Sequence, residues 1–131
     1  MNTTSELLTI QQVAEITGLS VYTLRYYERI GLIYRIDRAQ NTHRRYSSDD
    51  LGWIDFLLKL RATGMSIQDM QRYAELQCEG EQTLPERLEM MRAHRLKVQA
   101  QIGELQEHLD RICSKIEYYE GVLAEKMPNV S

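Results

Sequence analysis

The chain has 131 residues, 43% of them hydrophobic and 27% charged, a composition typical of one small globular domain with an appendage. This length excludes a large enzyme. The sequence has no run of about 18 apolar residues and does not begin like a signal peptide, so we expect a cytoplasmic protein with no membrane partner. The net charge of −3 would by itself argue against a nucleic-acid binder.

Charge is distributed unevenly along the chain. Residues 1–72 contain nine Lys or Arg against eight Asp or Glu, whereas residues 73–131 contain seven against eleven. Within Tyr22–Arg45, six arginines stand against only Glu28 and Asp37. The guanidinium group is a planar fork of donors that suits phosphates and base edges. This local basic charge fits DNA, although a solvated arginine-rich surface would have the same composition.

Two short helices joined by a tight turn are predicted at the start of the chain. Thr9 and Gln12 have the spacing of a capping box, which marks the start of a helix that ends at Gly18. Ser20 is a good N-cap for a second helix that runs to about Arg29. This order is that of a helix-turn-helix. Its second helix would present hydroxyl and guanidinium donors to DNA from Tyr22, Thr23, Arg25, Tyr26 and Arg29.

A wing and two further helices are predicted next. The helical periodicity is lost between Leu32 and Tyr46, where two short strands would surround a polar loop. A third helix then follows a cap of serines and aspartates and ends at Gly64. A capping-box pattern at Ser66 starts a fourth helix that runs to about Gln77.

One long helix is predicted from Pro85 onward, with apolar residues at alternating spacings of three and four. Only Arg95 is polar among these heptad positions, which are Leu88, Met91, Arg95, Val98, Ile102, Leu105, Leu109, Ile112, Ile116, Tyr119 and Leu123. A helix of roughly 38 residues would be about 57 Å long, more than the first domain can cover. The apolar stripe is therefore expected to form a dimer interface with a second copy, and a helix folded back on its own domain is the alternative.

The predicted fold is therefore mainly α-helical. Its segments are a winged helix-turn-helix DNA-binding domain at 7–77 (helix-turn-helix 7–31, wing 32–46, helical pair 48–77), a linker at 78–84, a coiled-coil dimerisation helix at 85–123 and a short tail at 124–131.

Four stretches of sequence resemble the MerR family of transcriptional regulators, namely LTIQQVA from Leu8, LRYYERIGLI from Leu24, RRYS from Arg44 and LRATGMS from Leu60. The long C-terminal helix is similar to the family's antiparallel dimer helix. The resemblance implies a homodimer that binds a near-palindromic promoter operator and distorts the spacer DNA so that RNA polymerase can engage both promoter elements. The DNA contacts that it implies are Ser20, Thr23, Arg25, Tyr26 and Tyr27 on the second helix, His43, Arg44 and Tyr46 at the wing, and Arg61 in the third helix. Packing in the core is the alternative for each tyrosine, and a surface ion pair is the alternative for Arg25 and Arg44.

The family resemblance implies an effector-binding region after the dimer helix, and residues 124–131 leave no room for one, so the two thiols, Cys78 and Cys113, are the candidate sensors. They are too few and too far apart for a disulfide framework, which favours a reducing compartment. Their spacing resembles that of metal-responsive members of the family, in which such cysteines meet across the dimer, but the further ligands of those members are absent. The segments around Tyr73, Thr83 and Lys115 look more like the short aldehyde- and thiol-stress subgroup. That resemblance implies a response to aldehydes, electrophiles or thiol stress without a metal or a cofactor. A purely structural role of both thiols is the alternative.

Two other classes of protein are alternatives to a DNA-binding regulator. A coiled-coil adaptor would bind a protein partner through the helix-turn-helix and would not retain DNA at low salt. An enzyme has little support, because the sequence has no nucleophile with a paired base, no phosphate-binding loop and no metal motif. We therefore expect a regulator and no enzymatic activity.

Overall fold

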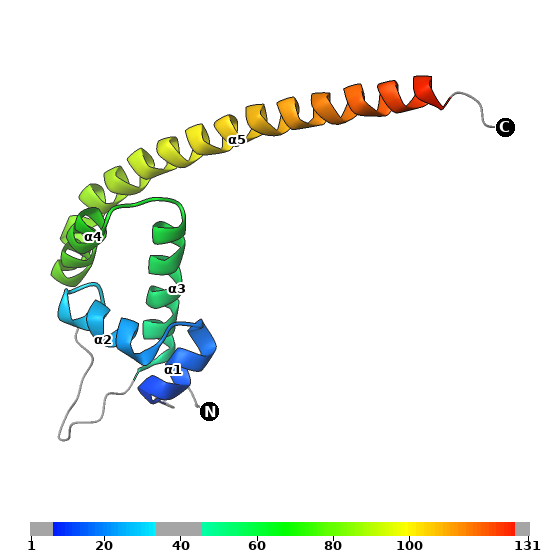
Figure 1. Ribbon diagram of the computed structural model, residues 1–131. Coiled ribbons are helices and arrows are strands. Elements are labelled where there is room, and N and C mark those ends of the chain that lie inside the picture. Colours follow the sequence, from blue (N-terminus) through cyan, green and yellow to red (C-terminus); the bar gives the residue numbers. More distant parts are fainter. Residues whose placement is uncertain (1–6, 34–45, 128–131) are drawn as a thin grey trace, which may run out of the picture. The chain divides into compact units, whose positions relative to one another are not determined.

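The computed structural model describes residues 7–33 and 46–127. In chain order the elements are α1 (Ile10–Thr17), α2 (Val21–Arg29), α3 (Ser48–Ala62), α4 (Ile67–Glu79), a short 3-10 helix η2 (Glu81–Thr83) and α5 (Leu84–Lys126), as Figure 1 shows. The chain divides into two compact units, Met1–Arg92 and Ala93–Ser131, and α5 contributes to both. The mainly α-helical class, with a helix-turn-helix and a long C-terminal helix, is confirmed.

The helices begin at polar side chains that bond the first backbone amides. At α1, Thr9 Oγ1 accepts a hydrogen bond from the Gln12 backbone N–H at 3.2 Å, and Gln12 Oε1 accepts one from the Thr9 N–H at 2.8 Å. This reciprocal pair is the predicted capping box. Ser20 caps α2 as predicted. At Ser66, by contrast, the structure shows only the bond from the amide three residues on, so α4 starts with a simple N-cap.

The turn between α1 and α2 depends on Gly18. Its backbone is left-handed, with φ 82°, and its N–H donates to the carbonyl of Ala14 at 2.9 Å. Glycine adopts this conformation without the steric cost that a Cβ atom imposes. The chain therefore enters α2 within three residues, which places α1 and α2 in contact.

The core of the first unit is made by the inner faces of its helices and the segments beside them. Trp53 stacks on Tyr73 with ring centroids 5.7 Å apart, and its indole N–H donates to the carbonyl of Leu32 at 2.8 Å. These contacts join α3 to α4 and to the segment after α2. The buried core residues are Ile10, Val13, Leu24, Tyr27, Leu32, Ile33, Tyr46, Ile54, Leu57, Leu60, Met70 and Tyr73.

The predicted wing lies mostly outside the described residues, which leave out residues 34–45. At its C-terminal end, Tyr46 forms an isolated antiparallel bridge with Leu8. The two N–H···O bonds of this bridge measure 2.8 and 2.9 Å. Tyr46 thus ties the start of α3 to the segment that precedes α1, a long-range pairing that the sequence did not predict.

The stretch 78–84, which the sequence predicts as a linker, is mostly helical. Helix α4 continues to Glu79. Only Gly80 separates it from η2, and α5 follows η2 directly. Gly80 has φ 109°, a conformation that side chains rarely adopt. Most residues of the stretch are therefore part of helices.

Side chains at this junction satisfy backbone carbonyls near the end of α4. Thr83 is buried, and its Oγ1 donates to the carbonyl of Leu76 at 2.7 Å. Arg87, in α5, donates to Thr83 Oγ1 at 2.9 Å and to the carbonyl of Gly80 at 3.0 Å. Buried carbonyls need such partners, so these bonds hold the junction in one conformation.

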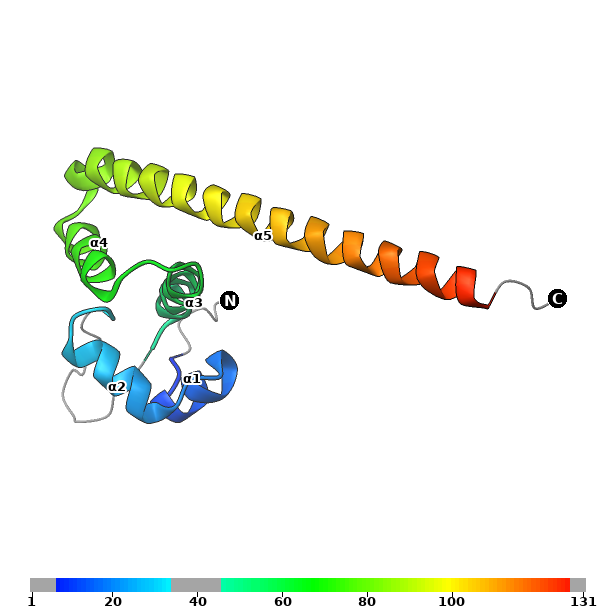
Figure 2. The same cartoon turned by 45° about the horizontal axis from the view of Figure 1, so that its top comes forward.

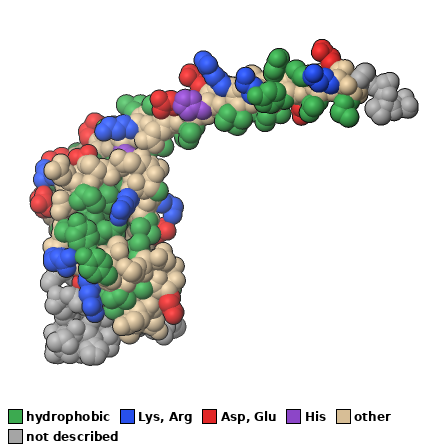
Figure 3. Space-filling model, in the orientation of Figure 1, with side chains coloured by type: hydrophobic (Ala, Val, Ile, Leu, Met, Phe, Trp, Pro, Cys, Tyr) green, Lys and Arg blue, Asp and Glu red, His purple; other side chains and the backbone are tan. Residues whose placement is uncertain are grey.

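Helix α5 is uninterrupted over 43 residues, about 64 Å at 1.5 Å per residue (Figure 2). Its first turns belong to the first unit, where Met90 and Met91 pack partly against the core. No residue of α5 is buried, and Figure 3 shows hydrophobic side chains along its length. The exposed large apolar residues at heptad positions are Leu88, Ile102, Leu105, Leu109, Ile112, Ile116, Tyr119 and Leu123. None of the helices in the described part of the chain is long and apolar enough to cross a membrane.

Candidate nucleic-acid interface

Helix α2 has one buried face and one exposed polar face. Leu24 and Tyr27 point into the core, with 0% and 1% of their surface exposed. The opposite face carries Tyr22, Arg25, Tyr26 and Arg29, which share one side of the helix because they are three, four and seven residues apart. These side chains offer guanidinium and hydroxyl donors, which suit DNA phosphates and base edges.

Contacts within this face hold Arg29 in place. Its guanidinium carbon lies 5.5 Å from the centroid of the Tyr26 ring, a cation–π distance. The Tyr26 ring lies 6.1 Å from the Tyr27 ring, centroid to centroid. Tyr26 is 38% exposed, so it is accessible to a ligand as well as to its neighbours.

The contacts that the family resemblance implies omit Tyr22 and Arg29, although the sequence already predicts both among the donors that the second helix presents to DNA. Tyr22 is 74% exposed, an unusual environment for a tyrosine. The spacing of the sequence is enough to place both residues on this face, because they lie three residues before and four residues after Arg25, on the side opposite Leu24. We add both residues to the candidate interface.

Arg61 lies in the last turn of α3 and is exposed. Its Nη1 group donates a hydrogen bond to the hydroxyl of Tyr27, which joins the end of α3 to α2. Tyr27 itself is 1% exposed, so the prediction that it contacts DNA directly needs correction. Its place on the inner face of α2 leaves only its hydroxyl in contact with a polar surface group.

Tyr46 is also buried, with 0% of its surface exposed. Its hydroxyl donates to the Glu28 carboxylate, and its backbone pairs with Leu8. The prediction that Tyr46 contacts DNA is therefore corrected, because its ring is buried in the core, where its contacts are with Glu28 of α2 and with Leu8 before α1.

Ser20 and Thr23 are bonded to each other at the start of α2. Ser20 Oγ accepts from the Thr23 backbone N–H and donates to Thr23 Oγ1, each at 3.0 Å. The Ser20 hydroxyl thus caps the helix, and the Thr23 hydroxyl accepts its hydrogen bond. A contact of either residue with DNA stays a prediction. The predicted wing contacts His43 and Arg44 lie outside the described residues.

The two candidate sensor thiols lie in different units. Cys78 is in α4 and Cys113 in α5; both are exposed, and neither forms a disulfide bond. The described residues contain no group of three or more His, Cys, Asp or Glu side chains that could hold a metal ion.

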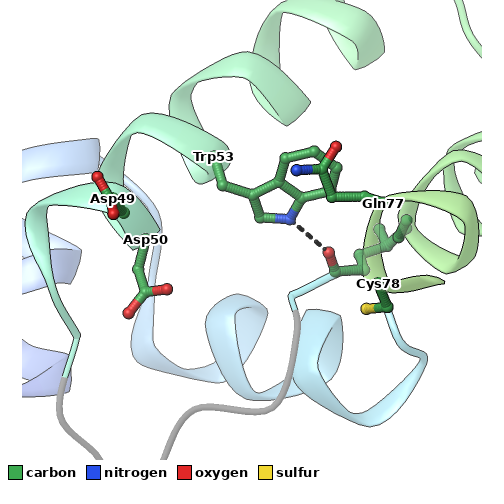
Figure 4. A pocket seen from close by; sticks show the side chains of 7 residues that line it. Asp49, Asp50, Trp53, Gln77 and Cys78 are labelled. Carbon is green, nitrogen blue, oxygen red and sulfur yellow. Dashed lines mark hydrogen bonds between the residues drawn. The ribbon is translucent and has the colours of Figure 1, made fainter. Parts of the chain in front are cut away.

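Cys78 lines a cavity of about 290 Å³ between α3 and α4. Asp49, Asp50 and Trp53 line it from α3, whereas Gln77 and Cys78 line it from α4 (Figure 4).

Several polar groups of this cavity already have partners within the protein. Asp50 Oδ2 accepts from the Ser47 N–H at 2.8 Å, and Gln77 Oε1 accepts from Arg87 at 2.8 Å. The Trp53 indole N–H donates a hydrogen bond to the carbonyl of Leu32. A small-molecule site usually has a few polar groups converging on the ligand. The cavity therefore offers little to fix a ligand in one orientation.

A helix-turn-helix whose second helix exposes arginines and tyrosines defines a DNA-binding regulator. The model of the MerR HTH family regulatory protein matches residues 8–77, and that of the MerR DNA-binding region matches residues 51–114. The chain belongs to the MerR family of transcription regulators, which are not enzymes.

Similar proteins agree with this assignment. An uncharacterized HTH-type transcriptional regulator of Haemophilus influenzae is 38% identical over 86% of this chain and 83% of its own length. HiNmlR, a MerR family regulator lacking the sensor domain and bound to promoter DNA, is 36% identical, with a TM-score of 0.82 over 91% of this chain and 94% of its own. A MerR family regulator from Listeria monocytogenes is 39% identical, with a TM-score of 0.86 over 92% of this chain and 91% of its own.

Proposed function

We propose that the protein acts in the cytoplasm as a homodimer that binds a near-palindromic promoter operator, with helix α2 of each protomer reading one half-site. The exposed face of α2 supports this most strongly, because four donor-bearing side chains lie side by side on it. A two-fold dimer matches a palindrome, because each protomer meets the same sequence.

We assign the direct DNA contacts to helix α2, to the wing and to the end of α3. Arg25 and Tyr26, together with Tyr22 and Arg29, would enter the major groove, with Ser20 and Thr23 near the phosphates at the start of α2. His43 and Arg44 would contact DNA from the wing, as the family resemblance implies. Arg61 would contact the phosphate backbone beside α2, which its exposure at the end of α3 allows.

Dimerisation would occur through the apolar stripe of α5, paired antiparallel with the same stripe of a second copy. The heptad residues assigned to this interface are Leu88, Met91, Val98, Ile102, Leu105, Leu109, Ile112, Ile116 and Tyr119. Met91 is partly covered by the first unit, whereas Ile102, Leu105 and Ile112 are 58% or more exposed. Burying each such side chain contributes about 1.5–3 kcal/mol, so a second copy would be strongly favoured.

Binding of such a dimer would distort the DNA between the two half-sites and so control the access of RNA polymerase to the promoter. A deformation of this kind costs on the order of 1–6 kcal/mol, within what the protein–DNA contacts can supply. HiNmlR supports the proposal because it is bound to promoter DNA and lacks the sensor domain.

Selection from a pool of random-sequence duplexes tests this function. The unmodified chain should enrich an inverted repeat, and fluorophores at the two ends of that duplex should report a changed end-to-end distance when protein binds. Enrichment of no sequence would contradict operator recognition, and an unchanged distance would contradict the distortion.

The proposed stimulus is an aldehyde, another electrophile or thiol oxidation, read by Cys78 and Cys113. The exposure of both thiols supports reaction with small reagents. A Cys78→Ser/Cys113→Ser double variant should therefore bind the selected duplex normally but lose the change in promoter-reporter output on addition of aldehyde or diamide.

Ala100→Ser, at an exposed position of α5 thirteen residues before Cys113, serves as a control for an exchange to serine away from the thiols and should keep the response. A full response in the double cysteine variant would eliminate thiol sensing. A response to a soft metal ion in the unmodified chain alone would instead favour the metal-dependent alternative.

A further inference from the structure

Tyr27 combines a buried ring with a hydroxyl that reaches a surface charge. The ring is 1% exposed and fills the core under α2, while the hydroxyl accepts a hydrogen bond from Arg61 Nη1, 34 residues further along the chain. A buried tyrosine ordinarily directs its hydroxyl to a polar partner. Here the partner is the charged end of an exposed arginine.

This bond restricts a side chain that would otherwise be flexible. Arginine carries about 2 kcal/mol of rotamer entropy, which must be lost when its head group is fixed on a ligand. The guanidinium has five N–H donors, and the bond to Tyr27 uses one Nη group. The remaining donors can meet a phosphate while the Tyr27 hydroxyl limits the directions in which Arg61 can point.

The Tyr27–Arg61 pair lies beside the exposed face of α2. The Tyr27 ring is 6.1 Å from the Tyr26 ring, and the Tyr26 ring lies 5.5 Å from the Arg29 guanidinium. Two arginines from different helices thus flank one pair of tyrosines. Arg61 therefore belongs to the same surface as the helix that would enter the groove.

We propose that Tyr27 is a positioning residue that orients Arg61 toward a DNA backbone phosphate without touching DNA itself. The proposal rests on the function proposed above, in which α2 and Arg61 form one DNA interface. It predicts that the Tyr27 hydroxyl matters for binding only through Arg61.

The test is the affinity of Tyr27→Phe for the selected duplex, measured over a range of salt concentrations. Removal of the hydroxyl should weaken binding about tenfold, the effect of one hydrogen bond to a charged group. The slope of log affinity against log salt should also become shallower, by up to about 0.9 for each phosphate that the variant no longer binds. In an Arg61→Ala background, Tyr27→Phe should cause no further loss of affinity.

Tyr46→Phe is the matched control, because Tyr46 is equally buried but bonds Glu28 instead of Arg61. Any effect of Tyr46→Phe should be the same with or without Arg61. Thermal unfolding of each free variant measures changes in stability separately from binding.

Three results would overturn the proposal: unchanged affinity in Tyr27→Phe, an equal loss from Tyr27→Phe in the Arg61→Ala background, or unchanged affinity in Arg61→Ala alone. The last variant alters only an exposed side chain, so it gives an answer even if Tyr27→Phe folds poorly. A clear selected repeat together with any of these results would leave operator recognition standing. The first two results would remove only the role of Tyr27, whereas the third would also remove the phosphate contact assigned to Arg61.

Discussion

Replacing Arg25 with alanine is expected to weaken binding to the selected duplex by at least about thirtyfold. Arg25 lies at the centre of the exposed face of α2, between Tyr22 and Arg29 in the chain. A bidentate contact between arginine and a base contributes about 1–3 kcal/mol, and a symmetric dimer loses two of them, about 2–6 kcal/mol in total. Fluorescence anisotropy with a labelled duplex measures this loss.

The control for Arg25→Ala is Arg72→Ala, which removes an exposed arginine from α4. Arg72 lies 3.4 Å from Glu75 and 3.6 Å from Glu86, so its charge is already partly balanced. Its removal should change affinity less than about threefold, because exposed ion pairs contribute little. Equal affinities of Arg25→Ala and the unmodified chain would show that α2 does not read the operator.

Ile112→Glu is expected to convert the dimer into a monomer. Ile112 is 58% exposed and lies in the apolar stripe of α5, where an antiparallel partner would bury it. Each dimer would then contain two unpaired carboxylates in its interface, and burying an uncompensated charge costs several kcal/mol. Sedimentation should report the chain mass of 15.4 kDa in place of twice that value.

Two further readouts should follow from the loss of the dimer. The second unit consists largely of α5 without a buried residue, and isolated helices are only marginally stable in water. The far-UV circular dichroism of Ile112→Glu should therefore decrease. Its affinity for the selected duplex should also fall, because two half-sites are no longer bound by one molecule.

Ser114→Glu is the matched control for Ile112→Glu. Ser114 is exposed on α5 only two residues away, but it lies on the opposite side of the helix from the stripe. This variant should remain dimeric and helical. A dimeric Ile112→Glu, or a monomeric Ser114→Glu, would contradict the assigned interface.

Local signals in the sequence were sufficient to predict most helix starts. The caps at Thr9 and Ser20 act within three residues, so the pattern and the structure coincide there. The heptad repeat likewise predicted one long helix, because apolar residues spaced three and four apart form one stripe only when the chain is helical.

Long-range contacts explain where the predicted site was incomplete. Tyr26 and Tyr27 are adjacent and chemically identical, yet one is 38% exposed and the other 1%. The partner of the Tyr27 hydroxyl is 34 residues away, and Tyr46 is buried because it pairs with Leu8. Neither contact leaves a pattern in the nearby sequence, so DNA contacts were predicted for both Tyr27 and Tyr46, with packing in the core left open as the alternative.

The helical structure of the predicted linker could not be predicted for a related reason. Gly80 does interrupt the helix, which the sequence indicates, but the chain resumes a helical path at once. The side chains that stabilise this path are Thr83 and Arg87, through bonds to carbonyls that precede them. Such bonds depend on how α4 and the start of α5 pack, which residue types alone do not specify.

The way α5 begins has a practical consequence for dividing the protein. Met90 and Met91 cover part of the core of the first unit, and the Arg87 side chain holds the end of α4. A fragment cut at residue 77 would lose all of these groups and leave apolar surface open to water. A fragment designed to keep the first unit intact should therefore extend to Arg92, because a shorter piece would be destabilised by the loss of these contacts.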